Sequence, residues 1–518
     1  MNDYFFTETL INKLGAITDE MAEYLIKSSF STNIKERRDC STVILDKKGL
    51  ILYLAEHIPI HLGSFLNIIK SIYKIYSVKE IGKNDYFISN DVFFGGGSHL
   101  PDIVMVTPVF YKNRLLNWVG NIAHHADFVN RGHENIYQEG IIIPPLKIIK
   151  NNIFQKDIFR LIINNCQLQK ERNIDVMAQI SANKVGKKQL CQLYKNNSYS
   201  KLIKGFINIL SSSRIKIISE IQKLKKGSYY FKEDFDSTEI DFTFEMKINI
   251  QIKQNKIIIN FLDFPSQLNI GLNLTYAGLC STVYFAIKCI LDPFGLSNSG
   301  SFSPIEINAK KGSMINCIKP AAVDGRVDTC QRIVDLIFGC FSKIIPDKVI
   351  AAGNGSCNSI IFTGYDPIKK ENFIYLETIG GGSGARVNKN GLDGVHVHVT
   401  NTSNLPIECL ENEYPIKILC YELIDKSYGE GKYRGGKGIR RTYKIEIDDC
   451  KYQSHGSRII IKPWGLFGGK EGNCYKIYKN NEKNIEINNN GVLMKNETIT
   501  IETAGGGGYG EFKKSALY

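Results

Sequence analysis

The sequence NDVFFGGGSHLPDIVMVTPVF at residues 90–110, followed by WVGNIAHHADFVNRGHENIYQEGIIIPP at residues 118–145, decides how this part of the chain folds. Residues 104–110 alternate between apolar and polar positions as a strand does, and residues 112–114 have the composition of a tight turn. Residues 117–126 then return as a second strand. We therefore expect a β-hairpin that brings the segments HLPD and HHAD side by side.

Histidine is concentrated around this hairpin, because six of the nine histidines lie between residues 57 and 133: His57, His61, His99, His124, His125 and His133. Asp102 follows His99 by three residues, and Pro101 stiffens the backbone between them. Neutral imidazole and carboxylate are the ligands that a divalent metal of intermediate hardness prefers. The pattern predicts a metal site, and the competing interpretation is a His–Asp hydrogen bond that only stabilises the loop.

The other members of the cluster are open to two interpretations. His124 and His125 are adjacent, so a strand would point them to opposite faces, and only one can readily join His99. The other could orient a ligand, move protons or be a plain core residue, and Asp127 could orient a ligand from behind the site. Asp39 stands among basic residues, where a surface ion pair is the default, and becomes a ligand only if the fold returns it to the hairpin.

The remaining histidines give weaker signals. His57 and His61 flank a rigid Ile-Pro-Ile segment, which favours packing in a core as strongly as a functional role. His133 lies in a loop, where a substrate contact and a plain surface position are equally expected. His396 and His398 are two residues apart on a predicted strand and would share a face, and we interpret them as structural or interfacial.

Length and composition exclude several classes of protein. A chain of 518 residues predicts two to four cores, and its net charge of +13 is spread over a lysine-rich surface without an arginine-rich helix, so we expect no nucleic-acid partner. No apolar run is long enough for a membrane span, and no signal peptide is recognisable. Thirteen cysteines without a C-x-x-C pair indicate reduced thiols and a cytoplasmic location. No phosphate-binding loop for ATP or a dinucleotide is present.

The pattern along the chain predicts an α+β protein of several domains. We place a metal-site region with a helical second half at 1–230, a mixed strand and helix region at 231–376, and a β-rich, glycine-rich region at 377–518. Residues 3–31 predict a pair of amphipathic helices, and residues 275–291 predict a buried helix. The glycine clusters of the last region are interpreted as turns or close backbone packing, with an anion-binding nest as the alternative.

These segments resemble the hydantoinase B/oxoprolinase family, the B-type subunits of ATP-dependent N-methylhydantoinases and 5-oxoprolinases. The resemblance runs almost end to end, through NIKERRDCS, AEHIPIHLGS, GGGSHLPDI, HHAD, EGIIIPP, DGVHVHVTNTSNLPIE, GEGKYRGGKGI, KPWGLFGG and ETAGGGGYG. Subunits of acetone and acetophenone carboxylases are similar as well. Ala123 replaces the glycine of the usual GHHAD segment, which changes backbone freedom and no ligand.

The resemblance implies one half of a two-component enzyme. An A-type ATPase partner would bind ATP and phosphorylate the amide oxygen of a cyclic imide or lactam, and this chain would hold a divalent metal, Zn or Mn, and complete the ring opening in a hetero-oligomer. The ligands carried over are Asp39, His99, Asp102 and His124, with His125 or Asp127 moving protons. Two alternatives stay open: a subunit of an ATP-dependent ketone carboxylase, and a non-catalytic scaffold for the ATPase.

Overall fold

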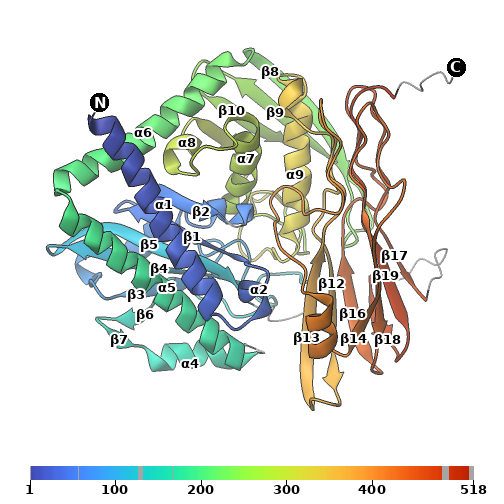
Figure 1. Ribbon diagram of the computed structural model, residues 1–518, viewed down its shortest axis with the longest axis horizontal. Helices are drawn as coiled ribbons and strands as arrows, with labels where there is room; N and C mark the ends of the chain where they lie inside the picture. The colour runs from blue at the N-terminus through green and yellow to red at the C-terminus, as the bar shows by residue number, and fades with distance from the viewer. Residues whose placement is uncertain (1, 57, 126–131, 167, 481–488, 513–518) are drawn as a thin grey trace.

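The computed structural model describes residues 2–56, 58–125, 132–166, 168–480 and 489–512. A helix-covered sheet forms the N-terminal part, a smaller sheet with two buried helices follows, and two facing sheets form the C-terminal part (Figure 1). This arrangement confirms the α+β class with several separate sheets. The residue ranges predicted for the domains remain a prediction. No helix in the described ranges is both long and apolar enough to cross a lipid bilayer.

The N-terminal sheet carries the hairpin that the sequence predicted. Its order is β2-β1-β5-β4-β3-β6-β7, and every neighbouring pair is antiparallel. The strands are β1 (Cys40–Asp46), β2 (Ile51–Glu56), β3 (Tyr86–Ser89), β4 (Asp102–Tyr111), β5 (Arg114–His124), β6 (Leu146–Lys150) and β7 (Ile153–Phe154).

Both faces of this sheet are covered, which explains the nearly continuous burial of β4 and β5. The long helices α1 (Asn2–Ser28) and α5 (Gln169–Asn196) pack on one face, where Val119 joins their apolar side chains. The 3-10 helix η1 (Pro59–Gly63) and α3 (Ile68–Ile75) pack on the other face against Trp118. Consecutive residues of β5 therefore enter two different cores, and the strand is fixed in register.

The predicted pair of helices at residues 3–31 is wrong, because α1 is a single helix of 27 residues. Its buried positions continue without a break along one face, from Leu10 and Leu14 through Met21 to Leu25. Gly15 lies inside the helix, where an added Cβ would be only 2.8 Å from the Tyr53 hydroxyl. A glycine that reads as a helix interruption instead permits close packing of α1 on β2.

Three helices, α4 (Lys156–Asn164), α5 and α6 (Tyr199–Lys223), join this sheet to the second one. Two short helices, α2 (Thr32–Lys35) and η2 (Val78–Glu80), precede β1 and β3 of the first sheet. The second sheet has the order β11-β10-β9-β8, with β10 and β11 parallel. Its strands are β8 (Gly227–Phe235), β9 (Phe244–Ile252), β10 (Ile257–Leu262) and β11 (Ile305–Asn308). It buries α7 (Tyr276–Leu291) and α9 (Arg326–Phe341). Two short helices are α8 (Ser299–Phe302), whose Phe302 joins the core of the N-terminal sheet, and η3 (Pro346–Lys348).

The C-terminal part is a pair of facing four-stranded sheets, so the predicted β-rich character of this region is confirmed. Ile360 and Phe362 of one sheet meet Tyr443, Ile499 and Ile501 of the other in a common core. The sheets are β13-β12-β16-β18 and β14-β15-β19-β17. Their elements are β12 (Asn358–Asp366), β13 (Glu371–Ile379), α10 (Ile407–Glu413), β14 (Ile416–Leu423), β15 (Ile439–Ile445), β16 (Cys450–His455), β17 (Lys476–Lys479), β18 (Asn490–Leu493) and β19 (Thr498–Glu502).

The glycine clusters pack backbone against backbone. The amide of Gly436 donates to the carbonyl of Ser383 at 2.8 Å, and the amide of Gly506 donates to the carbonyl of Gly436 at 2.9 Å. A Cβ added at Gly436 or at Gly506 would lie 1.9 Å from a neighbouring carbonyl oxygen. Of the two interpretations of these clusters, the structure therefore shows close backbone packing at these positions, since segments so near one another leave no space for side chains.

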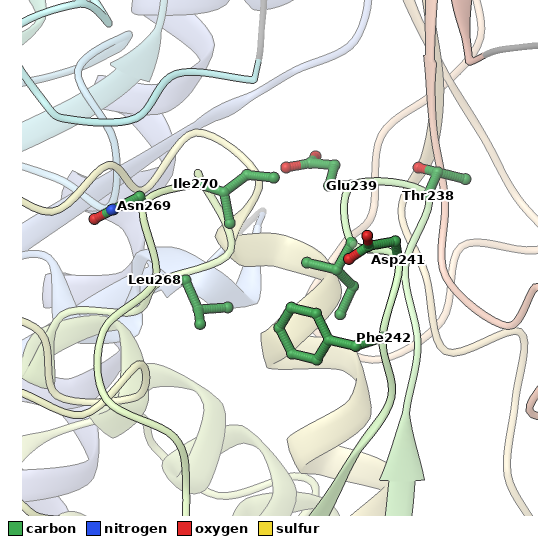
Figure 2. Close-up of a pocket in the computed structure, with 8 residues that line it drawn as sticks. Thr238, Glu239, Asp241, Phe242, Leu268, Asn269 and Ile270 are labelled. Atoms are coloured by element: carbon green, nitrogen blue, oxygen red, sulfur yellow. The ribbon is translucent and has the colours of Figure 1, made fainter.

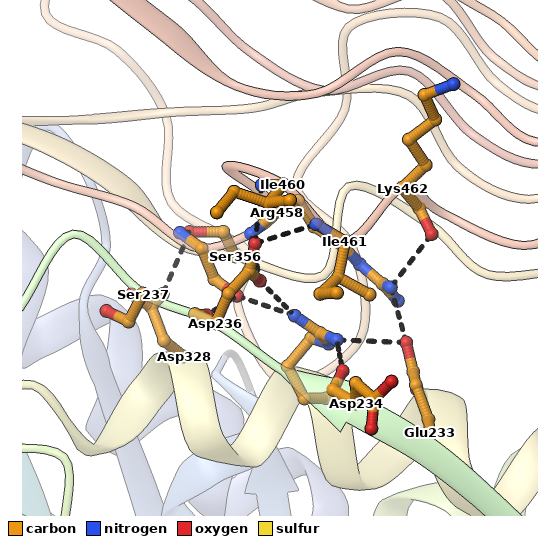
Figure 3. Close-up of polar contacts among 12 residues, drawn as sticks. Glu233, Asp234, Asp236, Ser237, Asp328, Ser356, Arg458, Ile460, Ile461 and Lys462 are labelled. Carbon is orange, nitrogen blue, oxygen red and sulfur yellow. Dashed lines mark hydrogen bonds and ion pairs between the residues drawn. The ribbon is translucent and has the colours of Figure 1, made fainter. Parts of the chain in front are cut away.

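A buried network of charges ties the second sheet to the C-terminal part (Figure 3). Arg332 of α9 contacts Glu233 at 3.1 Å and Asp236 at 3.0 Å. Arg458, which follows β16, contacts the same Glu233, and its Nη2 lies 2.7 Å from Asp335. Each guanidinium is thus paired with two carboxylates, as a charge removed from water requires.

Candidate metal centre

The strand register brings the predicted segments together. In the β4–β5 hairpin, Asp102 lies directly opposite His124, which confirms that HLPD and HHAD are neighbours. Strand β1 pairs with the other side of β5, and the amide of His124 donates to the carbonyl of Asp39 at 3.0 Å. The fold therefore returns Asp39 to the hairpin, the condition under which the sequence allowed it to be a ligand.

Three side chains converge at the end of this hairpin. One ligand atom from each of His99, Asp102 and His124 lies within 4.8 Å of the other two, and all three residues are buried. His99 Nε2 is 3.3 Å from Asp102 Oδ1, and the rings of His99 and His124 have their centroids 4.7 Å apart. Two imidazoles and a carboxylate at these separations are a ligand set for a divalent cation.

The loop before β4 holds the Asp102 carboxylate in one orientation. Its Oδ2 accepts hydrogen bonds from the Ser98 amide at 3.1 Å and from the Ser98 hydroxyl at 2.6 Å, and Arg326 Nη2 lies 2.7 Å from the same hydroxyl. Gly97 has φ +113° and passes so close that an added Cβ would be 2.6 Å from the Asp102 Cβ. Asp102 Oδ1 accepts no hydrogen bond of normal geometry from the described residues and faces the imidazoles. A carboxylate oxygen buried in this way fits a bound cation.

His61 belongs to the same cluster, although the sequence favoured core packing for it as strongly as function. Its Nε2 lies 3.8 Å from Asp39 Oδ1 and 3.8 Å from Asp102 Oδ1, and its Nδ1 is 3.0 Å from the Ser41 hydroxyl. The ring is buried, as a core residue would be, but it faces two carboxylates. Its nearness in sequence to the other histidines was the signal that could have found it.

Burial and neighbouring charges shift the pKa values of the two carboxyl groups in the cluster. Burial opposes the ionisation of Asp102, but His99 and His61 hold the pKa of its carboxyl well below the usual value. Burial raises the pKa of Asp39 to about 6, against the attraction of His61. Perturbed carboxyl groups beside imidazoles are typical of functional sites, and a bound cation would favour the ionised form of both acids.

The cluster opens into a small cavity of about 60 Å³ between the N-terminal sheet and the C-terminal part. Besides the cluster, its lining includes Asn33, Arg37, Arg326, Thr378 and Thr402. A larger hollow of about 490 Å³ lies between residues 238–242 and 268–270, where Figure 2 shows Phe242 and Leu268 facing one another. That hollow contains carboxylates but no histidine in its lining, so the small cavity is the better candidate for metal chemistry.

His125 points to the opposite side of β5. Its Nε2 lies 3.0 Å from the side-chain oxygen of Gln179 on α5, and its ring does not line the cavity. Burial and the nearby Arg172 lower the pKa of His125 to about 4, which keeps the imidazole neutral. Its predicted role in proton transfer remains a prediction. Asp127 and His57 lie outside the described residues.

The other histidines have separate partners. His133 Nδ1 lies 2.9 Å from Asp324, away from the cavity lining. The predicted strand at GVHVHVT is wrong, since these residues form no regular strand and His398 has φ +53°. His398 contacts Asp335 in the buried charge network, whereas His396 Nε2 lies 3.4 Å from the hydroxyl of Thr402. A loop backbone separates two side chains that a strand would have placed on one face.

Comparison with known sequences matches nearly the whole chain. A family model described as hydantoinase B/oxoprolinase matches residues 3–512. An uncharacterised protein of Methanocaldococcus jannaschii is 36% identical over 98% of this chain and 91% of its own length. The 5-oxoprolinase of Saccharomyces cerevisiae is 30% identical over 95% of this chain. This chain spans only 41% of that 5-oxoprolinase.

Solved structures share the fold at lower sequence identity. The ATP-dependent caprolactamase of Pseudomonas jessenii superposes with a TM-score of 0.88 at 21% identity, covering 98% of this chain and 90% of that chain. A nucleotide-free acetone carboxylase superposes with the same TM-score at 17% identity, covering 98% of this chain and 75% of that chain.

Proposed function

The chain belongs to the hydantoinase B/oxoprolinase family, and we propose that it is the metal-dependent component of an ATP-dependent cyclic amidohydrolase. In this proposal it opens the ring of a cyclic imide or lactam that an A-type ATPase has phosphorylated on the amide oxygen. The observation that carries the proposal is the convergence of His99, Asp102 and His124 within 4.8 Å at the end of one hairpin. Such a buried set of two imidazoles and a carboxylate has little value for stability without a cation, because buried polar groups are costly.

The length of the matching 5-oxoprolinase is consistent with an enzyme of two components, of which this chain is one. This chain corresponds to about two fifths of the matching 5-oxoprolinase, and the other part of that protein is available for nucleotide binding. The sequence of this chain contains no phosphate-binding loop of the common type. We therefore infer an ATPase partner that binds ATP and supplies the activated ring, in a hetero-oligomer.

The residues of the cavity would share the work as follows. His99, Asp102 and His124 would hold the metal, with Asp39 completing the set and His61 facing both acids at 3.8 Å. A bound divalent ion would supply Lewis acidity and lower the pKa of water toward about 7. Ser98 and Arg326 fix the Asp102 carboxylate, so the ligand geometry exists before substrate arrives.

The reaction needs two molecules of water. Oxygen of the first forms a bond to the carbon of the O-phosphorylated amide. The ring nitrogen takes up both protons of that water as the ring C–N bond breaks, which leaves an acyl phosphate and a free amine. The second water releases phosphate from that acyl group and yields the free carboxylate. Phosphorylation is required because an unactivated amide resists attack by water at neutral pH.

Reconstitution with an A-type ATPase tests the proposal. We expect ring opening of 5-oxoproline, a hydantoin or a lactam that depends on both ATP and a divalent metal, and we expect His99→Ala to lose bound metal and turnover together. His133→Asn, which alters a histidine outside the cavity, is the control and should retain both. Full ATP-dependent turnover and native metal content in His99→Ala would refute the proposal.

The carboxylase alternative rests on the shared fold of acetone carboxylase. Dependence of turnover on bicarbonate, with no ring-opened product, would favour it. A chain that stays free of metal after supplementation would instead favour the non-catalytic scaffold.

A further inference from the structure

Arg37 is a buried guanidinium at the mouth of the cavity. It follows α2 and is only 5% exposed. Its Nη1 donates to Asn33 Oδ1 at 3.2 Å and its Nη2 donates to the carbonyl of Leu376, but its Nε has no hydrogen-bond partner within the described residues. Asn33 Nδ2 in turn lies 3.2 Å from His124 Nδ1, so Arg37 is one residue removed from the metal-ligand candidates.

The pairing of Arg37 differs from that of three other buried arginines. Arg332, Arg441 and Arg458 each have a carboxylate within 3.1 Å. Arg37, by contrast, forms no salt bridge with any carboxylate in the described part of the chain, and its own contacts are to neutral oxygens. Arginine stays charged at all ordinary pH values, and a buried charge without a counter-ion is strongly unfavourable. Asp39 attracts the Arg37 charge without forming a salt bridge with it, so a bound anion would supply the close partner that this guanidinium lacks.

The space beside Arg37 is large enough to receive that anion. An outer cleft of about 710 Å³ runs between α2 and β13 and shares Asn33, Arg37 and Leu376 with the small cavity. Across the cavity, the hydroxyls of Thr378 and Thr402 lie 2.7 Å apart. A ligand seated in the cleft would thus reach the metal-ligand candidates past Arg37.

We propose that Arg37 binds an anionic oxygen group of the substrate and so turns the reacting carbon toward His99, Asp102 and His124. The identity of the substrate rests on the proposed function, whereas the anion site itself rests on the geometry around Arg37. Two groups have the required chemistry: the phosphoryl group added by the ATPase, and a carboxylate carried by the ring. A guanidinium binds either through two N–H groups, which a lysine ammonium does not reproduce.

Binding of inorganic phosphate to the full chain tests the anion site without the partner. With metal present, we expect titration calorimetry to show phosphate binding that Arg37→Met weakens by roughly tenfold or more. Arg38→Met is the matched control, because Arg38 is the next residue, its side chain is 59% exposed, and it forms a surface ion pair with Glu23. It should bind phosphate as the native chain does.

Arg37→Met should also remain folded, because methionine fills similar space and removes an unpaired buried charge. Arg37→Lys keeps the charge and provides a second variant, with affinity between those of the native chain and Arg37→Met. Unchanged phosphate affinity in Arg37→Met, or equal loss in the Arg37 and Arg38 variants, would overturn the proposal.

Turnover with the ATPase partner separates the two sources of the anion. The compounds are 5-oxoproline and 2-pyrrolidone, which share the five-membered lactam and differ in the ring carboxylate. If Arg37 binds the phosphoryl group, Arg37→Met lowers kcat/KM for both rings by similar factors. If it binds the carboxylate, only 5-oxoproline is affected, and native rates on both rings would overturn the proposal. Phosphate binding that depends on Arg37 without ring opening by the native chain would refute the proposed function and leave the anion site standing.

Discussion

Replacement of Ser98 by alanine tests whether the loop before β4 preorganises a metal ligand. The Ser98 hydroxyl donates to Asp102 Oδ2 at 2.6 Å and lies 3.0 Å and 2.7 Å from Arg326 Nε and Nη2. Without it, Asp102 Oδ2 keeps the amide of residue 98 and a looser ion pair with Arg326 Nη2 at 3.6 Å, and its Oδ1 is less firmly directed at His99. Loss of such a contact behind a ligand lowers metal affinity by roughly 10–100-fold, which is about 1.4–2.8 kcal/mol of binding free energy.

The same substitution also affects folding, and the design separates the two effects. Arg326 loses a hydrogen-bond acceptor, which costs about 1.5–3 kcal/mol of stability because the donor is charged. Ser89→Ala is the matched control, since Ser89 is equally buried in β3, its hydroxyl donates to the carbonyl of Ile143 at 3.0 Å, and it does not line the cavity. It should cost about 1 kcal/mol of stability and leave metal affinity unchanged.

Metal affinity is measured by competition with a chromogenic chelator at a temperature where thermal melts show both variants to be folded. Zinc and manganese are each titrated, because the ligand set accepts either. Ser98→Ala should show the weaker affinity and Ser89→Ala the native one. Native affinity in Ser98→Ala, or equal weakening in both variants, would refute the idea that the Ser98 hydroxyl positions the Asp102 carboxylate.

Three further predictions concern groups outside the ligand set. Burial and the nearby Asp324 raise the pKa of Glu139 to about 8, so the folded state holds a proton that the unfolded state releases above about pH 4.5. The free energy of unfolding should therefore fall between about pH 4.5 and 8, by up to about 1.4 kcal/mol per pH unit. Urea titrations of Glu139→Gln should show a flatter dependence of stability on pH. Glu233→Gln removes the carboxylate shared by two buried arginines and should lower the free energy of unfolding by about 3–5 kcal/mol. The control Lys462→Gln alters an exposed ion pair and should lower it by less than about 1 kcal/mol. Equal losses in the two variants would contradict the structural role of the network. His125→Asn tests the predicted role of His125 in proton transfer. Transfer through this imidazole should shift the pH profile of kcat, whereas an unchanged profile would assign the ring, which lies 3.0 Å from Gln179, to packing between the sheet and α5.

The sequence by itself determined the features that depend on neighbours along the chain. Alternation over two short segments and a tight turn were enough to predict the hairpin, and a hairpin leaves few ways to place Asp102 relative to His124. The α+β class and the β-rich C-terminal part followed from periodicity in the same way. Predictions failed where packing overrides local pattern, as in α1, which stays continuous through Gly15 because the sheet surface stabilises a single long helix.

Only the tertiary structure decided which distant residues meet the hairpin. Asp39 reaches it because β1 pairs with β5, and His61 reaches it because η1 packs beneath the sheet. Arg37 contacts Leu376 of β13, which is more than 300 residues away in sequence. The segment NIKERRDCS therefore could not show that Arg37 is buried, nor that it forms no salt bridge with a carboxylate among the described residues. Long-range contacts arise from the burial of whole faces, and periodicity shows that a face is buried without showing what covers it.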